Sequence, residues 1–345
     1  RIDAIINIKK DPDFESFEPD GPDGLTWVWR MVEKVEGVGE LLEDLKKNTF
    51  DRYEAFTVAE VFNMKENELD QFIGDNGHFS TMFDFCAHSV LASKKGPYGS
   101  TAEKLEKLKH VLFQSQLKCQ DVGFMANVLE NHDIPRCIDR YLPAYAQNAS
   151  GAKMLGTIST LLRGIPFLYQ GQEIGMRNCP MDSIDDYDDI GTRWEYQTAI
   201  ESGLSQAQAL NACYHTSRDN ARTPMQWDSS LSAGFSTGKP WLKVNPNYTK
   251  VNVEAQLSDG DSILSYYKKL LALRKSSEYR EVFTYGAFCP LLEDTENLLA
   301  YERKLDHKSA AVFANFGEKE LTVKAEALSG ATVLLSNQDN VLIKE

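Results

Sequence analysis

The chain has 345 residues, of which 42% are hydrophobic and 26% are charged, a composition typical of a folded globular protein. Its 51 acidic and 37 basic residues give a formal net charge of −14, which argues against nucleic acid or an anionic membrane as the main partner, because both attract basic surfaces. No apolar run approaches the ~20 residues that a membrane-spanning helix needs, so we expect no membrane partner.

The start of the chain and its cysteines bear on the compartment of the protein and on whether the chain is complete. The chain opens on Arg1-Ile2-Asp3, without an initiator methionine and without the pattern of a signal peptide. The six cysteines are scattered and include no C-x-x-C pair, so we expect neither a structural zinc site nor a disulfide framework. These features predict a cytoplasmic protein. The apolar opening is typical of a buried strand, and we therefore expect that an upstream part is missing.

Helical and strand patterns alternate through the first half of the chain. Apolar spacing predicts helices near residues 38–45, 100–112 and 152–162, and short apolar runs predict strands near residues 55–61, 79–86, 124–129 and 165–169. Strands separated by helices in this way indicate βα units and a parallel sheet.

The pattern changes after the last of these strands. Residues 171–260 are rich in Asp, Asn, Gly and Pro, and we expect a long functional loop region with one helix near 205–214. A further helix is predicted at 263–273. Short strands are then predicted at 298–303, 310–315, 321–325 and 332–335, which indicates a small antiparallel β domain.

Three carboxylates stand at the carboxyl ends of predicted strands, the edge that carries the active site of a parallel α/β barrel: Asp3, Glu60 and Asp133. Arg1 lies on the same side of its strand as Asp3 and would hold that carboxylate ionised, which suits a nucleophile. Glu60 follows an apolar run, and burial would favour the protonated form that a general acid requires. His132, beside Asp133, could hydrogen-bond a polyol.

Simpler interpretations compete with each of these. A carboxylate at a strand end is more often a helix cap or a loop residue, and a single histidine is more often structural. The acidic cluster at 185–189 lacks the register of a calcium loop, so we interpret it as a solvated loop. Cys86 and His88 have no second pair at zinc spacing. No nucleotide-binding or serine-hydrolase motif occurs, and we expect neither a metal nor a cofactor in this chain.

Taken together, the motifs resemble those of the α-amylase superfamily, glycoside hydrolase family 13. Residues 1–3, 59–61 and 131–133 occur in its order and rough spacing, and residues 164–176 resemble its eighth barrel strand. Residues 217–228, followed by 233–241 and 244–248, closely resemble the oligo-1,6-glucosidase and α-glucosidase branch. The resemblance covers essentially the whole chain.

The resemblance implies an α/β fold: a partial TIM (β/α)8 barrel with strands four to eight in residues 1–278, followed by a clipped antiparallel β domain in residues 279–345. The first three strands, an inserted loop domain and the calcium site of some relatives would then lie upstream. We expect such a fragment alone to be weak or inactive.

The resemblance also implies a role for each site residue. Asp3 matches the nucleophile, Glu60 the general acid/base, and Asp133 the third carboxylate, which binds the 2- and 3-hydroxyls of glucose. The substrate-binding positions are Arg1, Ala4, Val61, His132, Arg136 and Arg222. Ala4 stands where relatives that prefer α-1,6 linkages often carry valine and maltase-like relatives carry threonine, so it leaves the linkage preference open.

The implied function is that of a retaining, exo-acting α-glucosidase on oligosaccharides such as isomaltose, with α-1,4 linkages as a second option. Retention requires the Asp3 and Glu60 carboxyls to lie about 5–5.5 Å apart. The alternatives are a trehalose-6-phosphate hydrolase, a sucrose isomerase or transglucosidase, and an inactive sugar-binding fragment. The sequence leaves the oligomeric state open.

Overall fold

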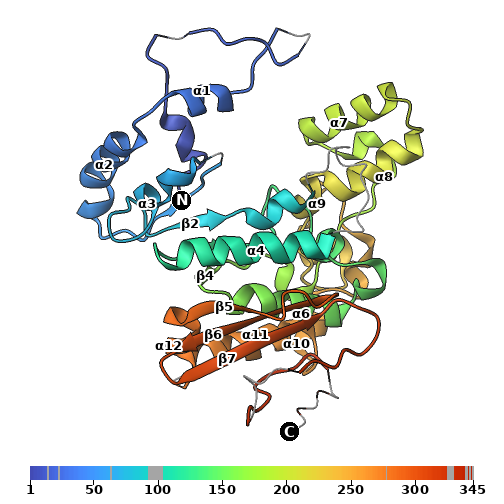
Figure 1. Cartoon of the computed structure of the whole chain (residues 1–345). Coiled ribbons are helices and arrows are strands. Elements are labelled where there is room, and N and C mark those ends of the chain that lie inside the picture. Colours follow the sequence, from blue (N-terminus) through green and yellow to red (C-terminus); the bar gives the residue numbers. More distant parts are fainter. Residues whose placement is uncertain are drawn as a thin grey trace. The chain divides into compact units, whose positions relative to one another are not determined.

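A computed structural model of the chain describes residues 1–13, 15–21, 24–62, 64–91, 104–276, 278–324 and 330–338, together with residues 341 and 343. The chain forms two compact units, both drawn in Figure 1. The first consists of Arg1–Asp84, Ser115–Asn127 and Arg163–Ile165, and the second of Phe85–Gln114, Val128–Leu162 and Pro166–Glu345. No helix in the described ranges is long and apolar enough to cross a membrane.

The parallel sheet is built from short strands that neighbour one another in chain order. These are β1 (Val58–Ala59), β2 (Thr81–Asp84), β3 (Ala126–Asn127) and β4 (Ile165–Pro166). β1 pairs in parallel with β2, β2 pairs in parallel with β3, and Ile2 forms a parallel bridge to Ala59. A four-stranded sheet in chain order, with parallel pairing from Ile2 through β3, fits the part of a (β/α)8 barrel that the sequence predicted.

Helices and an apolar core support this sheet within the first unit. The helices are α1 (Trp29–Lys34), α2 (Val38–Asn48) and α3 (Leu69–Phe72), and α4 (Lys104–Gln120) contributes its last residues. The predicted helix near 38–45 is confirmed as α2, whose Val38 and Leu42 are one turn apart and buried. They join Ala59 and Phe72 in one hydrophobic cluster, which fixes β1 and therefore the residue that follows it.

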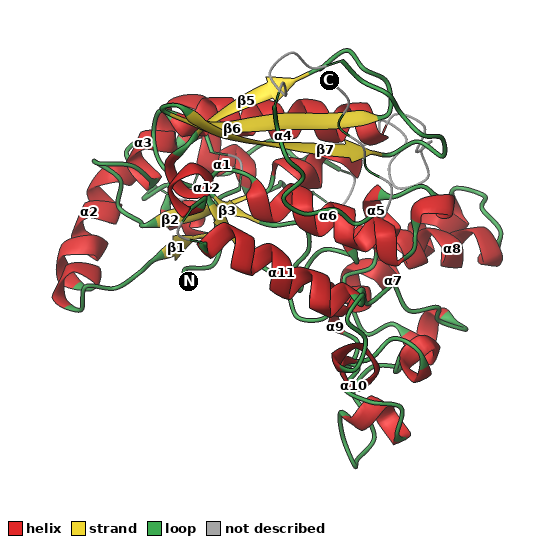
Figure 2. Ribbon diagram, turned by 90° about the horizontal axis from the view of Figure 1, so that it is seen from below, coloured by secondary structure: helices red, strands yellow, loops and turns green. Residues whose placement is uncertain are grey.

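The second unit is mainly helical. Besides the first part of α4, it contains α5 (Cys137–Tyr141), α6 (Ala149–Leu161), α7 (Ile190–Glu201), α8 (Gln206–Thr216), α9 (Asp219–Arg222), α10 (Val253–Leu257), α11 (Ile263–Lys275) and α12 (Arg280–Tyr285). α6 packs on α11 (Figure 2), and α7 lies beside α8 (Figure 1). The segment 171–260 is more helical than predicted, because Asp189 caps α7 by accepting a hydrogen bond from the Thr192 N–H.

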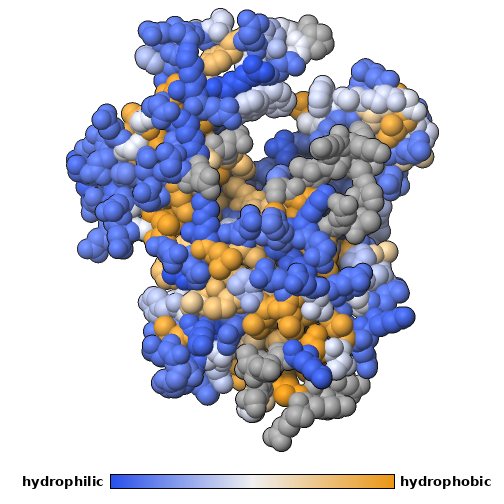
Figure 3. Space-filling model, in the orientation of Figure 1, coloured by the Kyte–Doolittle hydropathy of each residue, from blue (hydrophilic) through white to orange (hydrophobic). Residues whose placement is uncertain are grey.

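A three-stranded antiparallel sheet follows α12, made of β5 (Ala287–Leu291), β6 (Leu298–Leu305) and β7 (Lys308–Asn315). The predicted strands at 298–303 and 310–315 are confirmed. Those at 321–325 and 332–335 are wrong over their described residues, 321–324 and 332–335, which form no strand. Figure 3 shows hydrophobic surface over this sheet in the lower part of the view. The proposed domain boundary near residue 278 stays a prediction.

Two buried polar side chains of β6 donate hydrogen bonds to carbonyl groups near the C-terminal ends of α6 and α12. The last carbonyl groups of a helix have no partner within the helix. Arg303 is fully buried and donates from Nη1 to the carbonyl oxygens of Leu161 (2.9 Å) and Phe283 (3.0 Å) and from Nη2 to that of Gly286 (2.7 Å). The Tyr301 hydroxyl donates to another carbonyl oxygen of α6 at 2.8 Å. These bonds join β6 to α6 and α12.

Candidate active site

The first unit brings together Arg1, Asp3 and Glu60. We call these three residues the acid pair with its arginine. Arg1 Nη2 donates to Asp3 Oδ1 and to Glu60 Oε1, at 2.7 Å in both cases. The two carboxylate oxygens are therefore no farther apart than twice that distance. The parallel bridge between Ile2 and Ala59 explains the arrangement, because Asp3 and Glu60 each directly follow a bridged residue.

The surroundings of Glu60 favour its protonated form. Its side chain is only 5% exposed, whereas that of Asp3 is 78% exposed. Burial and then the neighbouring Asp3 carboxyl raise the pKa of Glu60 above its usual value, against the opposing effects of the Ala4 N–H and Arg1. A carboxyl that keeps its proton to higher pH can serve as a general acid.

Ala4 and Val61 support this arrangement through the backbone and the core. Ala4 adopts a left-handed conformation with φ of 41°, and its N–H donates to Glu60 Oε2 at 2.9 Å. Val61 is buried in the hydrophobic cluster of the first unit. A contact of either side chain with substrate stays a prediction.

Asp133 lies in the second unit, on the loop that follows β3, where the side chains of His132, Arg218 and Arg222 contact it. Its Oδ2 lies 2.9 Å from His132 Nε2, and its Oδ1 accepts from Arg222 Nη2 at 2.7 Å. Arg222 also donates from Nε to the His132 carbonyl oxygen at 2.8 Å. The guanidinium therefore orients the carboxylate and its loop together, and Asp133 remains 36% exposed for a ligand.

Two further members of this site, Arg218 and Asp189, were not assigned a role from the sequence. Arg218 donates to Asp189 Oδ1 from Nε at 3.0 Å and to Asp133 Oδ1 from Nη1 at 3.4 Å. Asp189 is buried, which corrects the interpretation of residues 185–189 as a wholly solvated loop. Burial opposes its ionisation, but bonds from Arg218 and Thr192 prevail and lower the pKa of Asp189. The spacing of Arg218 and Arg222, one helical turn, was the available signal. We call His132, Asp133, Asp189, Arg218 and Arg222 the Asp133 cluster.

Arg136 is buried behind this loop. Its Nη1 lies 3.1 Å from Glu130 Oε1 and donates to the Gln170 carbonyl oxygen at 2.8 Å, and its guanidinium stacks on the ring of Tyr169. The side chain is 1% exposed. Arg136 thus connects the segments that follow β3 and β4, while a direct contact with substrate stays a prediction.

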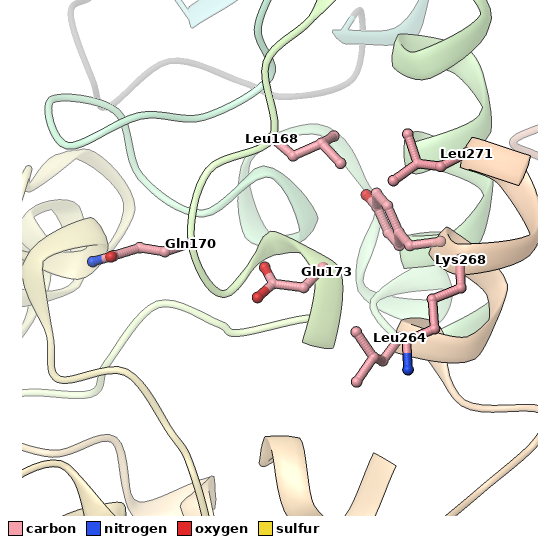
Figure 4. A pocket seen from close by; sticks show the side chains of 7 residues that line it. Leu168, Gln170, Glu173, Leu264, Lys268 and Leu271 are labelled. Atoms are coloured by element: carbon pink, nitrogen blue, oxygen red, sulfur yellow. The ribbon is translucent and has the colours of Figure 1, made fainter. Parts of the chain in front are cut away.

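A separate cavity of about 340 Å³ lies between the segment after β4 and α11, and none of the predicted site residues lines it. Figure 4 shows Leu168, Gln170 and Glu173 on one side and Leu264, Lys268 and Leu271 along α11. Burial raises the pKa of Glu173. In the part of the chain that the structure describes, no group of three or more His, Cys, Asp or Glu side chains could hold a metal ion.

Comparisons with known proteins agree on one family. A model of the alpha-amylase catalytic domain matches residues 1–286. The chain is 35% identical to the probable oligo-1,6-glucosidase 3 of Bacillus subtilis, over 91% of the chain and 56% of that protein. It is 34% identical to the oligo-1,6-glucosidase of Parageobacillus thermoglucosidasius, over 92% and 57%.

Solved structures show the same likeness. The trehalose-6-phosphate hydrolase of Bacillus licheniformis, in a mutant complex, matches 99% of the chain and 61% of its own length with a TM-score of 0.87 at 31% identity. An isomaltulose synthase from Klebsiella sp. LX3 matches 92% and 56% with a TM-score of 0.81 at 29% identity. The chain thus spans a little over half the length of the relatives it matches. It belongs to the α-amylase family, glycoside hydrolase family 13.

Proposed function

We propose that the whole protein is a retaining, exo-acting α-glucosidase that hydrolyses α-1,6-linked gluco-oligosaccharides such as isomaltose. The observation that carries this proposal is the acid pair with its arginine: an exposed carboxyl and a buried carboxyl with a raised pKa, bound by one nitrogen of Arg1. The two oxygens that Arg1 binds lie within twice 2.7 Å of each other, short of the ~6.5–9.5 Å spacing of inverting enzymes, which supports retention. The similarity to oligo-1,6-glucosidases supports the substrate class.

In the first step, Asp3 attacks the anomeric carbon of the terminal glucose as the bond to the leaving oxygen breaks. Glu60 gives its proton to that oxygen, so the leaving sugar departs as a neutral alcohol. The product on the enzyme is a glucosyl ester of Asp3.

In the second step, water takes the place of the leaving sugar. Glu60, now ionised, accepts a proton from the water as its oxygen attacks the anomeric carbon and the ester bond to Asp3 breaks. Glucose leaves with its original anomeric configuration, and both carboxyls return to their starting states. The reaction needs only water besides the substrate, so the proposal includes no cofactor.

The Asp133 cluster supplies the binding of the terminal glucose. We assign the carboxylate of Asp133 to the glucose hydroxyls, with His132 as a second hydrogen-bonding group. Arg222 and Arg218 hold Asp133 in one orientation, and Asp189 orients both arginines. Anions close to the sugar stabilise the positive charge that develops on its ring in the transition state.

The Asp133 cluster also favours a neutral sugar over a sugar phosphate. A phosphate ester needs cations with free donors. Arg218 and Arg222 are instead paired with Asp133 and Asp189, so their charges are already balanced. A trehalose-6-phosphate hydrolase is therefore the second candidate, and its structural similarity to this chain is the reason to test it.

The remaining proposals concern domains and location. We assign residues 1–278 to the catalytic barrel and 279–345 to a C-terminal β domain. We place the enzyme in the cytoplasm, which the free thiols of its six cysteines support.

The test is to assay the whole protein against isomaltose, maltose, sucrose and trehalose-6-phosphate. We expect isomaltose to have the highest kcat/KM and ¹H NMR to show α-glucose as the first product. β-Glucose as the first product would contradict retention, and a preference for trehalose-6-phosphate would favour the second candidate.

A further inference from the structure

Trp241 exposes a large aromatic ring next to the Asp133 cluster. Its side chain Nε1 donates to Asp188 Oδ2 at 2.9 Å, yet the residue is 66% exposed. The hydrogen bond satisfies the polar edge of the indole and restricts its rotation, while its apolar faces remain in water. A ring held in this way can bind an apolar face of a ligand with little loss of side-chain freedom.

Asp188, which accepts the hydrogen bond from Trp241, directly precedes Asp189, which orients the arginines of the Asp133 cluster. The N–H groups of Asp188 and Asp189 both donate to Asp219 Oδ2, at 2.7 and 2.9 Å, and Asp219 is fully buried. Asp189 then binds Arg218, which contacts Asp133. The ring and the glucose-binding carboxylate are therefore positioned by one hydrogen-bonded framework within the second unit.

Two more exposed apolar side chains follow this segment. α7 begins directly after Asp189 and is drawn beside α8 in Figure 1. Its Ile190 and Trp194 are 83% and 66% exposed and stand four residues apart, which puts them on one face of the helix. With Trp241, they make three exposed apolar side chains that follow the segment Asp188–Asp189 in the chain or are hydrogen-bonded to it.

We propose that Trp241 is a platform for the sugar units of the substrate that lie beyond the terminal glucose. The apolar C–H face of a pyranose ring stacks on an indole, and the neighbouring carboxylates accept hydrogen bonds from its hydroxyls. This inference rests on the proposed function, because it takes the Asp133 cluster as the site of the terminal glucose. It makes Trp241 a determinant of substrate length.

The experiment measures dissociation constants of glucose and isomaltotriose for the whole protein by ligand-observed NMR titration, with Asp3→Asn added to wild type and to every variant, so it does not depend on turnover. Trp241→Ala should weaken isomaltotriose about three- to tenfold, the range of an aromatic contact, and leave glucose unchanged. Asp188→Ala should lose part of that affinity, whereas Asp188→Asn keeps an acceptor for the indole and should match wild type. Trp227→Ala is the matched control: Trp227 is 49% exposed and lines a groove with Val253 and Leu257, so we expect no change.

Three outcomes overturn the platform: isomaltotriose binding to wild type no tighter than glucose, an unchanged isomaltotriose affinity in Trp241→Ala, or an equal loss of both sugars in that variant with an unchanged melting temperature. Asp133→Asn separates this inference from the proposed function. It should weaken both sugars alike. If it weakens neither while Trp241→Ala still weakens isomaltotriose, Asp133 does not hold the terminal glucose, and Trp241 binds a sugar at a site of its own.

Discussion

One guanidinium nitrogen of Arg1 binds both Asp3 and Glu60, and a substitution at each of these residues has its own expected effect. Asp3→Asn keeps the shape of the side chain and can still accept from Arg1, but an amide cannot form the glucosyl ester. We expect kcat for isomaltose in the whole protein to fall by about 10³-fold or more. Asp70→Asn, on an exposed face of α3, should have no effect. A loss of less than about tenfold in Asp3→Asn would reject the nucleophile assignment.

The protonation of Glu60 predicts a pH dependence with a definite sign. The acid must be protonated in the first step, so kcat/KM should fall as the pH rises through the pKa of Glu60, which lies above its usual value. Arg1 favours the ionised carboxylate. Arg1→Gln should therefore shift this alkaline limb to higher pH, even as overall activity declines. The pH profile of kcat/KM measures the shift, with Arg30→Gln as the control on an exposed ion pair. A shift to lower pH would contradict the argument.

Arg222 differs from an ordinary surface arginine because its guanidinium contacts a carboxylate and a carbonyl oxygen at once. Lysine keeps the charge but cannot reproduce this planar, two-pronged geometry. Arg222→Lys should lower kcat/KM for isomaltose about 30-fold, the equivalent of ~2 kcal/mol. Arg280→Lys, which alters an exposed pair with Glu281, should leave kcat/KM within about twofold. Equal effects of the two substitutions would remove Arg222 from the site.

At the scale of elements, stability at the junction of α6, α12 and β6 depends on Arg303. Replacing it with leucine would leave buried helix carbonyls without donors, and each such group costs roughly 1–3 kcal/mol. We expect Arg303→Leu to lower the free energy of unfolding by about 3 kcal/mol in urea denaturation. Arg280→Leu, at the exposed start of α12, should change it by less than about 0.5 kcal/mol. An unchanged free energy of unfolding in Arg303→Leu would mean that water or other groups donate hydrogen bonds to these carbonyls.

Elements with their own local pattern could be predicted from the sequence, and elements stabilised by distant partners could not. α2 and β6 have apolar residues at the spacing of their structures, and both were predicted. β5 was missed because it contains Pro290 and is held by pairing with β6. Similarly, Asp3, Glu60 and Asp133 were found because each follows a strand. Arg218 and Asp189 were not assigned because their pairing joins residues 29 positions apart, which no local spacing reveals.

At the scale of the whole molecule, the chain supplies part of a barrel, and the activity should reflect this. A complete barrel has eight strands, whereas the described residues form a four-stranded sheet with one further bridge at Ile2. We expect the 345-residue chain alone to hydrolyse isomaltose at less than about 1% of the rate of the whole protein. Parallel assays at equal molar concentration, with circular dichroism to verify folding, measure the difference. High turnover by the isolated chain would show that these segments suffice.

The position of Arg1 between Asp3 and Glu60 also determines the net charge of the reacting groups. With Glu60 protonated, one cation and one anion remain, so the group that meets the substrate carries no net charge. A neutral sugar then enters without displacing a bound counterion. Although the protein as a whole carries a formal charge of −14, its catalytic rate should therefore depend only weakly on ionic strength.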